Sequence, residues 1–496
     1  MTAGLCAAGA NSYTDWALAS PLTTRAPVLP NWSQGPLLGL AGATLAVALL
    51  AGGSSQPAMI STATAELFSL PLLGFALWLA TGGGLGRARW PAAILAAGVA
   101  IGAAQLVTLP VAVWRILPGR AAALADMVAA GSAPRFLAVS LDPGATARAL
   151  AALSPAIAIF LGVAVLGGAA RRRLIWLVLA LGVLSAFIGI AQATGRMSSF
   201  YAVTNPGFAV GFFANRNHFA ALMYALLPMA AAMAAPVRSG EDGQGRWRTG
   251  ALIAAAAMAG VYLLALAACR SRAGMALGVV ALIGAWAVFR VGRGGGRRTG
   301  GWAPGLIIVA AIVAFSLLQF TRVGLLASGR SLPLDEGRGA FTMTTLHASA
   351  HYAPLGAGLG AFVPAYEASE PVSTLTSEYI NHAHDDWAEL WLDGGVPMAA
   401  VVAAFLAWLV MAARRAWSRA TDVASALPGR AGSIVVGLLL VHSTVDYPLR
   451  TAAMSALFAL ACALMVPPPD LAPATRRRSR NAQSRPPEHL RRPARV

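Results

Sequence analysis

The residues best suited to chemistry lie in one short stretch, NHAHDDWAELWLDGG, at residues 381–395. Two histidines stand there beside two aspartates, namely His382, His384, Asp385 and Asp386. Histidine has the unperturbed pKa nearest neutral pH, so it can take a proton from a hydroxyl group. The same four side chains are also competent metal ligands, and a structural role for His384 is a third interpretation. The stretch therefore predicts acid–base chemistry, with a metal site and a packing role as alternatives.

This stretch ends a hydrophilic block, residues 321–394, in a chain that is otherwise poor in polar groups. The block holds four of the seven histidines and nine of the nineteen acidic residues. Apolar segments flank it on both sides. We therefore expect a folded loop that two membrane anchors hold over one face of the bilayer.

The overall composition indicates a membrane protein. Hydrophobic residues make up 57% of the 496 residues and charged residues only 11%, which is too little polar surface to cover a soluble globule. Apolar runs recur at close to the ~20 residues that a helix needs to cross the hydrocarbon. In lipid a helix satisfies every backbone amide within its own segment, so we predict an all-α polytopic membrane protein.

We predict twelve transmembrane helices, with the large loop between the ninth and the tenth. The expected spans are 36–53, 62–80, 91–109, 147–168, 174–193, 218–236, 251–269, 273–289, 302–320, 395–413, 431–447 and 451–466. The chain then divides into an N-terminal segment (1–35), helices one to nine (36–320), the loop (321–394), helices ten to twelve (395–466) and a basic tail (467–496).

Arginines predict the orientation of these spans, because the chain contains no lysine. With a cytoplasmic N-terminus, 25 of the 37 arginines fall on inner connections and the tail, which is the positive-inside pattern. Both termini are then cytoplasmic and the large loop faces outward, which in a Gram-negative bacterial cell means an inner-membrane protein with a periplasmic loop. An odd error in the number of spans would reverse this orientation.

The tail at 467–496 is rich in arginine and is expected to be disordered. Its charge favours anionic lipid head groups. No folded recognition element accompanies the charge, so we expect membrane lipids as partners and no nucleic acid.

Arginines on the outer side need a separate explanation, because the positive-inside tendency selects against them. Several lie at predicted helix ends or in the loop: Arg216, Arg270, Arg272, Arg338 and Arg450. An arginine at depth costs about 3 kcal/mol, so it usually faces a cavity and a partner, whereas one near the surface can extend to the interface. Asp446 is a possible structural partner for Arg450.

The order of several motifs resembles the O-antigen ligase and O-antigen polymerase superfamily of bacterial membrane glycosyltransferases, from about residue 105 to residue 465. The motifs are GFFANRNHFAALM (211–223), CRSRAG (269–274), GRGAFTMTTLHASAHYAPLGAGLGAFVPAY (337–366), the histidine stretch, and HSTVDYPLR (442–450). Each motif alone is loose. Their order, their sidedness and the place of the large loop carry the resemblance.

The resemblance also selects individual residues. The family signature has a histidine, an acidic residue nine positions later and a glycine two further on, which fits His384, Asp393 and Gly395 but not His382. The chain departs from the family pattern at Asp385, where asparagine is usual, and at Asp393, where glutamate is usual. The other matching positions are Asn215, Arg216, Asn217, Ser271, Arg272 and Arg338.

The resemblance implies transfer of a glycan from a polyprenyl (undecaprenyl) pyrophosphate to an acceptor hydroxyl, without a metal or another cofactor. His384 would be the general base or would orient the hydroxyl, with Asp385 or Asp386 fixing its tautomer. Arginine is always charged and binds phosphate oxygens in pairs, so the candidates for the pyrophosphate clamp are Arg216, Arg272 and Arg338. The supporting residues would be Asn215, Asn217, Ser271 and Asp393.

Other functions stay open at this point. Twelve spans with buried arginines also suit a transporter or flippase for a polysaccharide or a lipid-linked sugar, although no repeat relates the two halves of the chain. Within the enzyme class, the acceptor can be lipid A core, a growing polysaccharide or a protein. No motif distinguishes these acceptors.

Overall fold

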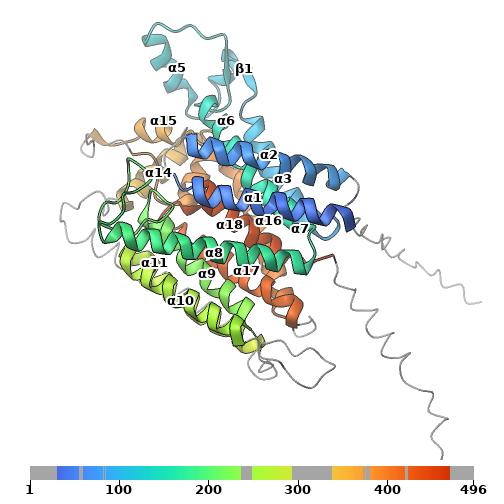
Figure 1. The fold of residues 1–496 in the computed structure, drawn as a ribbon. Helices are drawn as coiled ribbons and strands as arrows, with labels where there is room; N and C mark the ends of the chain where they lie inside the picture. Colours follow the sequence, from blue (N-terminus) through green and yellow to red (C-terminus); the bar gives the residue numbers. More distant parts are fainter. Residues whose placement is uncertain are drawn as a thin grey trace, which may run out of the picture.

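The computed structural model describes residues 31–54, 60–81, 83, 85–235, 249–292, 338–372, 375, 380–418 and 423–469. Within these ranges, nine helical segments are long and apolar enough to cross a membrane. They are α1 (Asn31–Ala51), α2 (Ile60–Thr81), the consecutive α6 (Pro143–Ala152) and α7 (Ser154–Ala164), α8 (Gly168–Ala193), α9 (Arg216–Ala234), α10 (Thr249–Cys269), α11 (Arg272–Gly292), α16 (Asp386–Ala416) and α17 (Val423–His442). The helices form one bundle (Figure 1). The predicted helical membrane class is confirmed.

The predicted number of twelve spans is not confirmed. The expected spans at 91–109 and 451–466 correspond to α3 (Arg89–Ala104) and α18 (Ala452–Met465), of 16 and 14 residues. At 1.5 Å per residue these helices reach only about 24 and 21 Å, less than the ~30 Å of hydrocarbon. The expected span at 302–320 lies outside the described residues, as does the start of the predicted loop.

Helix α9 lies at the centre of the bundle, and most of its side chains are buried. Small residues let its neighbours approach closely: a side chain at Gly274 of α11 would meet Ala220 of α9, and one at Gly182 of α8 would meet Leu226. Lipid gives apolar helices no hydrophobic reason to associate, so such close packing stabilises the bundle.

Two buried arginines bind the last carbonyls of neighbouring helices, at the end of the bundle opposite the histidine stretch. Arg171 donates to the carbonyls of Ala164 and Val466, at 2.7 and 2.6 Å. Arg430 donates to the carbonyl of Ala416, the last residue of α16, at 2.8 Å. The last carbonyls of a helix have no partner within the helix, and these guanidinium groups satisfy them. The sequence assigns both arginines to the inner connections.

Two segments outside the bundle lie at the end where α16 begins. The first contains α14 (Arg338–Tyr352) and α15 (Phe362–Glu367), joined by the glycine-rich turn PLGAGLG at 354–360. The second, residues 106–138, contains a two-stranded antiparallel sheet of β1 (Thr108–Pro110) and β2 (Phe136–Ala138), with α4 (Val111–Trp114) and α5 (Arg120–Ala129) between the strands. In Figure 1 this second segment stands clear of the bundle.

The glycine-rich turn packs directly on a break in α16. The break is at Gly395, whose φ of 53° and ψ of −146° are not helical. The turn bonds to the backbone around the break: Ala357 N–H donates to Leu392 O at 2.8 Å, and Val396 N–H donates to Pro354 O at 2.8 Å. A side chain at Gly395 would collide with the carbonyl oxygen of Pro354. These glycines therefore serve close backbone packing.

Replacing Gly395 by alanine is expected to destabilise the protein. The positive φ alone costs about 1–3 kcal/mol for a residue with a side chain, and the collision with Pro354 adds to this cost. Thermal unfolding of the purified protein in detergent measures the loss. Gly74→Ala in α2 is the control, because nothing lies within 4 Å of its added carbon. Equal melting temperatures for the two variants would contradict the proposed strain.

Candidate functional site

The histidine stretch meets the first turns of three helices. His384 and Asp385 immediately precede α16, and Asp385 caps that helix by accepting from the Trp387 and Ala388 N–H groups at 3.1 and 3.2 Å. Packed against them are residues 442–450, which join α17 to α18 and end in the short helix η3 (Pro448–Arg450). The starts of α9 and α11 reach the same place through hydrogen bonds.

His384 forms a pair with a buried carboxylate. Its Nδ1 lies 3.3 Å from Oδ1 of Asp446, whose side chain is fully buried, whereas the imidazole is 18% exposed. The backbone of His384 has a φ of 52°, which is unusual for a residue with a side chain. Strained backbone of this kind is most common where the surrounding structure fixes a functional group.

A chain of hydrogen bonds continues from Asp446 to the other two helices. Asn217, in the first turn of α9, donates from Nδ2 to Asp446 Oδ2 at 2.6 Å. Ser271, at the start of α11, donates from Oγ to Asn217 Oδ1 at 2.7 Å and accepts from the N–H of Gly274. Ser271, Asn217, Asp446 and His384 therefore form one connected polar chain across three helices.

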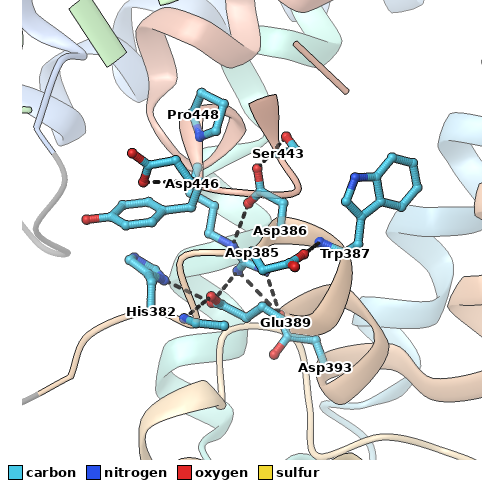
Figure 2. Close-up of polar contacts among 12 residues, drawn as sticks. His382, Asp385, Asp386, Trp387, Glu389, Asp393, Ser443, Asp446 and Pro448 are labelled. Atoms are coloured by element: carbon cyan, nitrogen blue, oxygen red, sulfur yellow. Dashed lines mark hydrogen bonds and ion pairs between the residues drawn. The ribbon is translucent and has the colours of Figure 1, made fainter. Parts of the chain in front are cut away.

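A second polar cluster surrounds Arg450. Its guanidinium contacts three carboxylates of α16: Asp386 at 3.2 Å, Glu389 at 3.0 Å and Asp393 at 3.3 Å. These residues are spaced three and four positions apart, so they share one face of the helix. Figure 2 shows their side chains turned toward one point. Burial acts to lower the pKa of Arg450, but the carboxylates outweigh it and raise that pKa above its ordinary value.

Glu389 links this cluster to the histidine stretch. It accepts from Nδ1 of His382 at 2.9 Å and from the backbone N–H of Ala383 at 3.0 Å. The residue directly before His384 is thus fixed by a buried carboxylate that Arg450 holds in place.

Comparison with known protein families gives a match over the part of the chain that contains His384. Residues 255–401 match the family model described as O-antigen ligase. This region is therefore similar to an O-antigen ligase domain. It runs from α10 to just beyond the break in α16 and contains Ser271, Arg272, Arg338, His384 and Asp393. The family implies a membrane enzyme with lipid-linked glycan substrates. No curated protein gave a match to the chain.

The carboxylate that contacts His384 lies outside the matched residues 255–401. The sequence predicted that Asp385 or Asp386 fixes the tautomer of His384, and this assignment needs correction. Asp385 caps α16, and Asp386 binds Arg450 and the hydroxyl of Ser443. The carboxylate on Nδ1 is Asp446. The suggested pairing of Asp446 with Arg450 is also corrected, because Arg450 binds the carboxylates of α16.

Two of the three predicted clamp arginines flank members of the polar chain. Arg216 is the first residue of α9, next to Asn217, and its guanidinium lies 4.3 Å from the centre of the Phe208 ring. Arg272 is the first residue of α11, next to Ser271, and its side chain is exposed. Asn215 caps α9 by accepting from Asn217 N–H at 2.8 Å.

The third clamp arginine, Arg338, is the first residue of α14. Its side chain lies outside the described part of the chain. The helix it opens reaches the site through Phe341, whose ring centre lies 6.1 Å from that of His384.

Sequence analysis missed Glu389 altogether. The available signal was its spacing, because Asp386, Glu389 and Asp393 fall on one helical face and Arg450 was already a candidate for pairing.

The metal interpretation of the histidine stretch has no geometric support here: among the described residues, no group of three or more His, Cys, Asp and Glu side chains could hold an ion.

Replacing Arg450 by alanine is expected to cost about 3 kcal/mol of stability, because it leaves two buried carboxylates, Glu389 and Asp393, and the partly exposed Asp386 without their cation. The melting temperature in detergent reports this loss. Arg196→Ala is the matched control, since Arg196 is exposed in the turn after α8. If Arg450→Ala has the same melting temperature as Arg196→Ala, the cluster does not stabilise the fold.

Proposed function

We propose that the protein transfers a glycan from a polyprenyl (undecaprenyl) pyrophosphate to an acceptor hydroxyl at the periplasmic face, as an O-antigen ligase or a related polysaccharide polymerase. One observation carries the proposal: a partly exposed imidazole, backed by a buried carboxylate, stands where the first turns of α9, α11 and α16 meet. The similarity of residues 255–401 to an O-antigen ligase domain supports it.

His384 is the general base of this proposal. Because Nδ1 faces Asp446, the proton of the acceptor hydroxyl passes to the other ring nitrogen, Nε2, as the oxygen attacks the anomeric carbon. Asp446 holds the neutral ring with its proton on Nδ1 and stabilises the imidazolium that forms. Asn217 and the backbone N–H of Tyr447 orient Asp446, donating at 2.6 and 3.0 Å.

The leaving group needs stabilisation of negative charge more than it needs a proton, because a polyprenyl pyrophosphate is a stable anion. Arg216 and Arg272 each open a helix whose N-terminus carries partial positive charge. In the proposal these arginines, joined by Arg338 from α14, bind the diphosphate. Arg450 has a different role, because its guanidinium is already engaged by three carboxylates.

A genetic experiment would identify the acceptor. Lipid A core, a growing polysaccharide and a protein all offer a suitable hydroxyl group. Deletion of the gene separates them: loss of O-antigen attachment indicates a ligase, loss of long chains a polymerase, and loss of a glycoprotein a protein O-oligosaccharyltransferase.

His384→Ala is expected to lower the transfer rate by about 10²- to 10⁴-fold, the usual contribution of general acid–base catalysis. Membrane insertion and melting temperature stay unchanged. The measurement is glycan transfer by purified protein in detergent, from a lipid pyrophosphate-linked donor. His351→Ala, an exposed histidine of α14, is the control. Near-normal transfer by His384→Ala removes this residue from the mechanism.

Asp446→Asn is expected to lower the rate by roughly 10²-fold, because the amide cannot stabilise the imidazolium. Binding of the donor lipid stays intact, so the maximal rate falls while the apparent KM for the donor does not change. Initial rates over a range of donor concentrations test this split. A rise in KM at unchanged maximal rate would assign Asp446 to donor binding instead.

A further inference from the structure

The segment that stands clear of the bundle, residues 106–138, is called the arm. It carries large apolar side chains that no other part of the described chain covers. Most exposed are Ile116 at 77%, Phe136 at 62% and Val128 at 59%, followed by Val107 at 55% and Val113 at 47%. Such a concentration of exposed apolar residues on one element marks a surface that binds another partner.

The arm is firmly attached at its base, so these side chains are held outward by the fold. Trp114 is buried and donates from Nε1 to Ala138 O at 2.6 Å. Arg120 is buried too, and donates to Val139 O at 2.8 Å and to Gly356 O at 2.7 Å. Its guanidinium also lies 5.3 Å from the centre of the Tyr352 ring.

Charge on the arm matches the surface of a phospholipid bilayer. Arg115 and Arg135 are exposed, and each directly precedes an exposed apolar residue, Ile116 and Phe136. Both pairs lie close together, because Val111 at the start of α4 donates its N–H to Arg135 O at 3.0 Å. Guanidinium groups beside apolar side chains are typical of segments that lie in the membrane interface, where phosphates and acyl chains meet.

The position of the arm fits the same partner. Its base is at the level of the candidate site, because Gln105 donates to the backbone oxygen of Asp393 at 2.9 Å. Nearby α2 turns large apolar side chains away from the bundle, among them Leu67, Phe68 and Trp78, as a helix facing lipid does. Figure 1 shows the arm projecting from the bundle on the side of α1 and α2. A bilayer that covered these side chains of α2 would place the arm over its surface.

We propose that the arm lies on the bilayer surface at the His384 end of the bundle, with Val113, Ile116 and Phe136 among the acyl chains and Arg115 and Arg135 on lipid phosphates. Arg120 and Gln105 connect this lipid-bound surface to the glycine-rich turn and to α16. The arm thus fixes the height of the site above the membrane, where a lipid-linked substrate presents its head group. The membrane contact itself does not depend on the transfer reaction.

Spin labels on full-length protein test the contact. Single cysteines replace Ile116, Phe136 or Asp126 in a Cys6→Ser background, in which Cys269 and Cys462 are buried. The protein is placed in vesicles of phosphatidylcholine with phosphatidylglycerol. Labels at 116 and 136 are expected to be accessible to oxygen and shielded from a water-soluble nickel chelate. The label at exposed Asp126 is the control and should be reached by the chelate. Equal chelate accessibility at all three positions would overturn the proposal.

A second variant tests the role of charge. Arg115→Gln with Arg135→Gln, neither of them in the candidate site, is expected to reduce the ratio of inserted to detached arm about fivefold per arginine. Vesicles of phosphatidylcholine alone should give a similar loss for the unchanged arm. The melting temperature should not change, because both side chains are exposed. An arm that stays equally inserted in all of these conditions contradicts the assigned contact between the arginines and lipid phosphates.

Discussion

The ion cluster around Arg450 is the interaction on which the candidate site depends. One guanidinium joins the segment between α17 and α18 to three carboxylates on a single face of α16. Removing these charges from water is costly, and only their mutual attraction offsets that cost. The cluster therefore fixes the start of α16 against its neighbours. Through Glu389 it also holds Ala383, and so determines where the next residue, His384, stands.

A chain of neutral and charged hydrogen bonds then connects His384 to the centre of the bundle. Polar side chains inside a membrane protein are expensive, and those that persist usually serve a function or pair with one another. Asp446, Asn217 and Ser271 do pair, and they join α9 and α11 to the histidine. Nearby His218 is fully buried, and its ring nitrogens have no hydrogen-bond partner within the described part of the chain; its Nε2 lies 3.9 Å from Asp446 Oδ1. A polar environment this closely connected favours proton transfer at a defined position.

Backbone hydrogen bonds and close packing connect the site to the arm and to the glycine-rich turn. The carbonyl of Asp393 accepts from Gln105 at the base of the arm and from Gly358 in the glycine-rich turn. Only glycine allows these backbones to approach so closely, because an added carbon at Gly356 would meet Asp393 O at 2.5 Å. The histidine, the broken helix and the arm therefore form one connected unit at one end of the bundle.

The sequence by itself determined the membrane class, because apolar runs are a property of neighbouring residues. Motif spacing selected His384 as the candidate base, and that role stays a prediction. The sequence also placed Arg216 and Arg272 at helix starts for the same local reason. Only the tertiary structure decided that Asp446, 62 positions away, is the carboxylate on His384. It also showed that Asp385 serves as a helix cap and that α3 and α18 are helices of only 16 and 14 residues. Contacts between distant segments depend on how helices pack, and no local pattern in the chain encodes that packing.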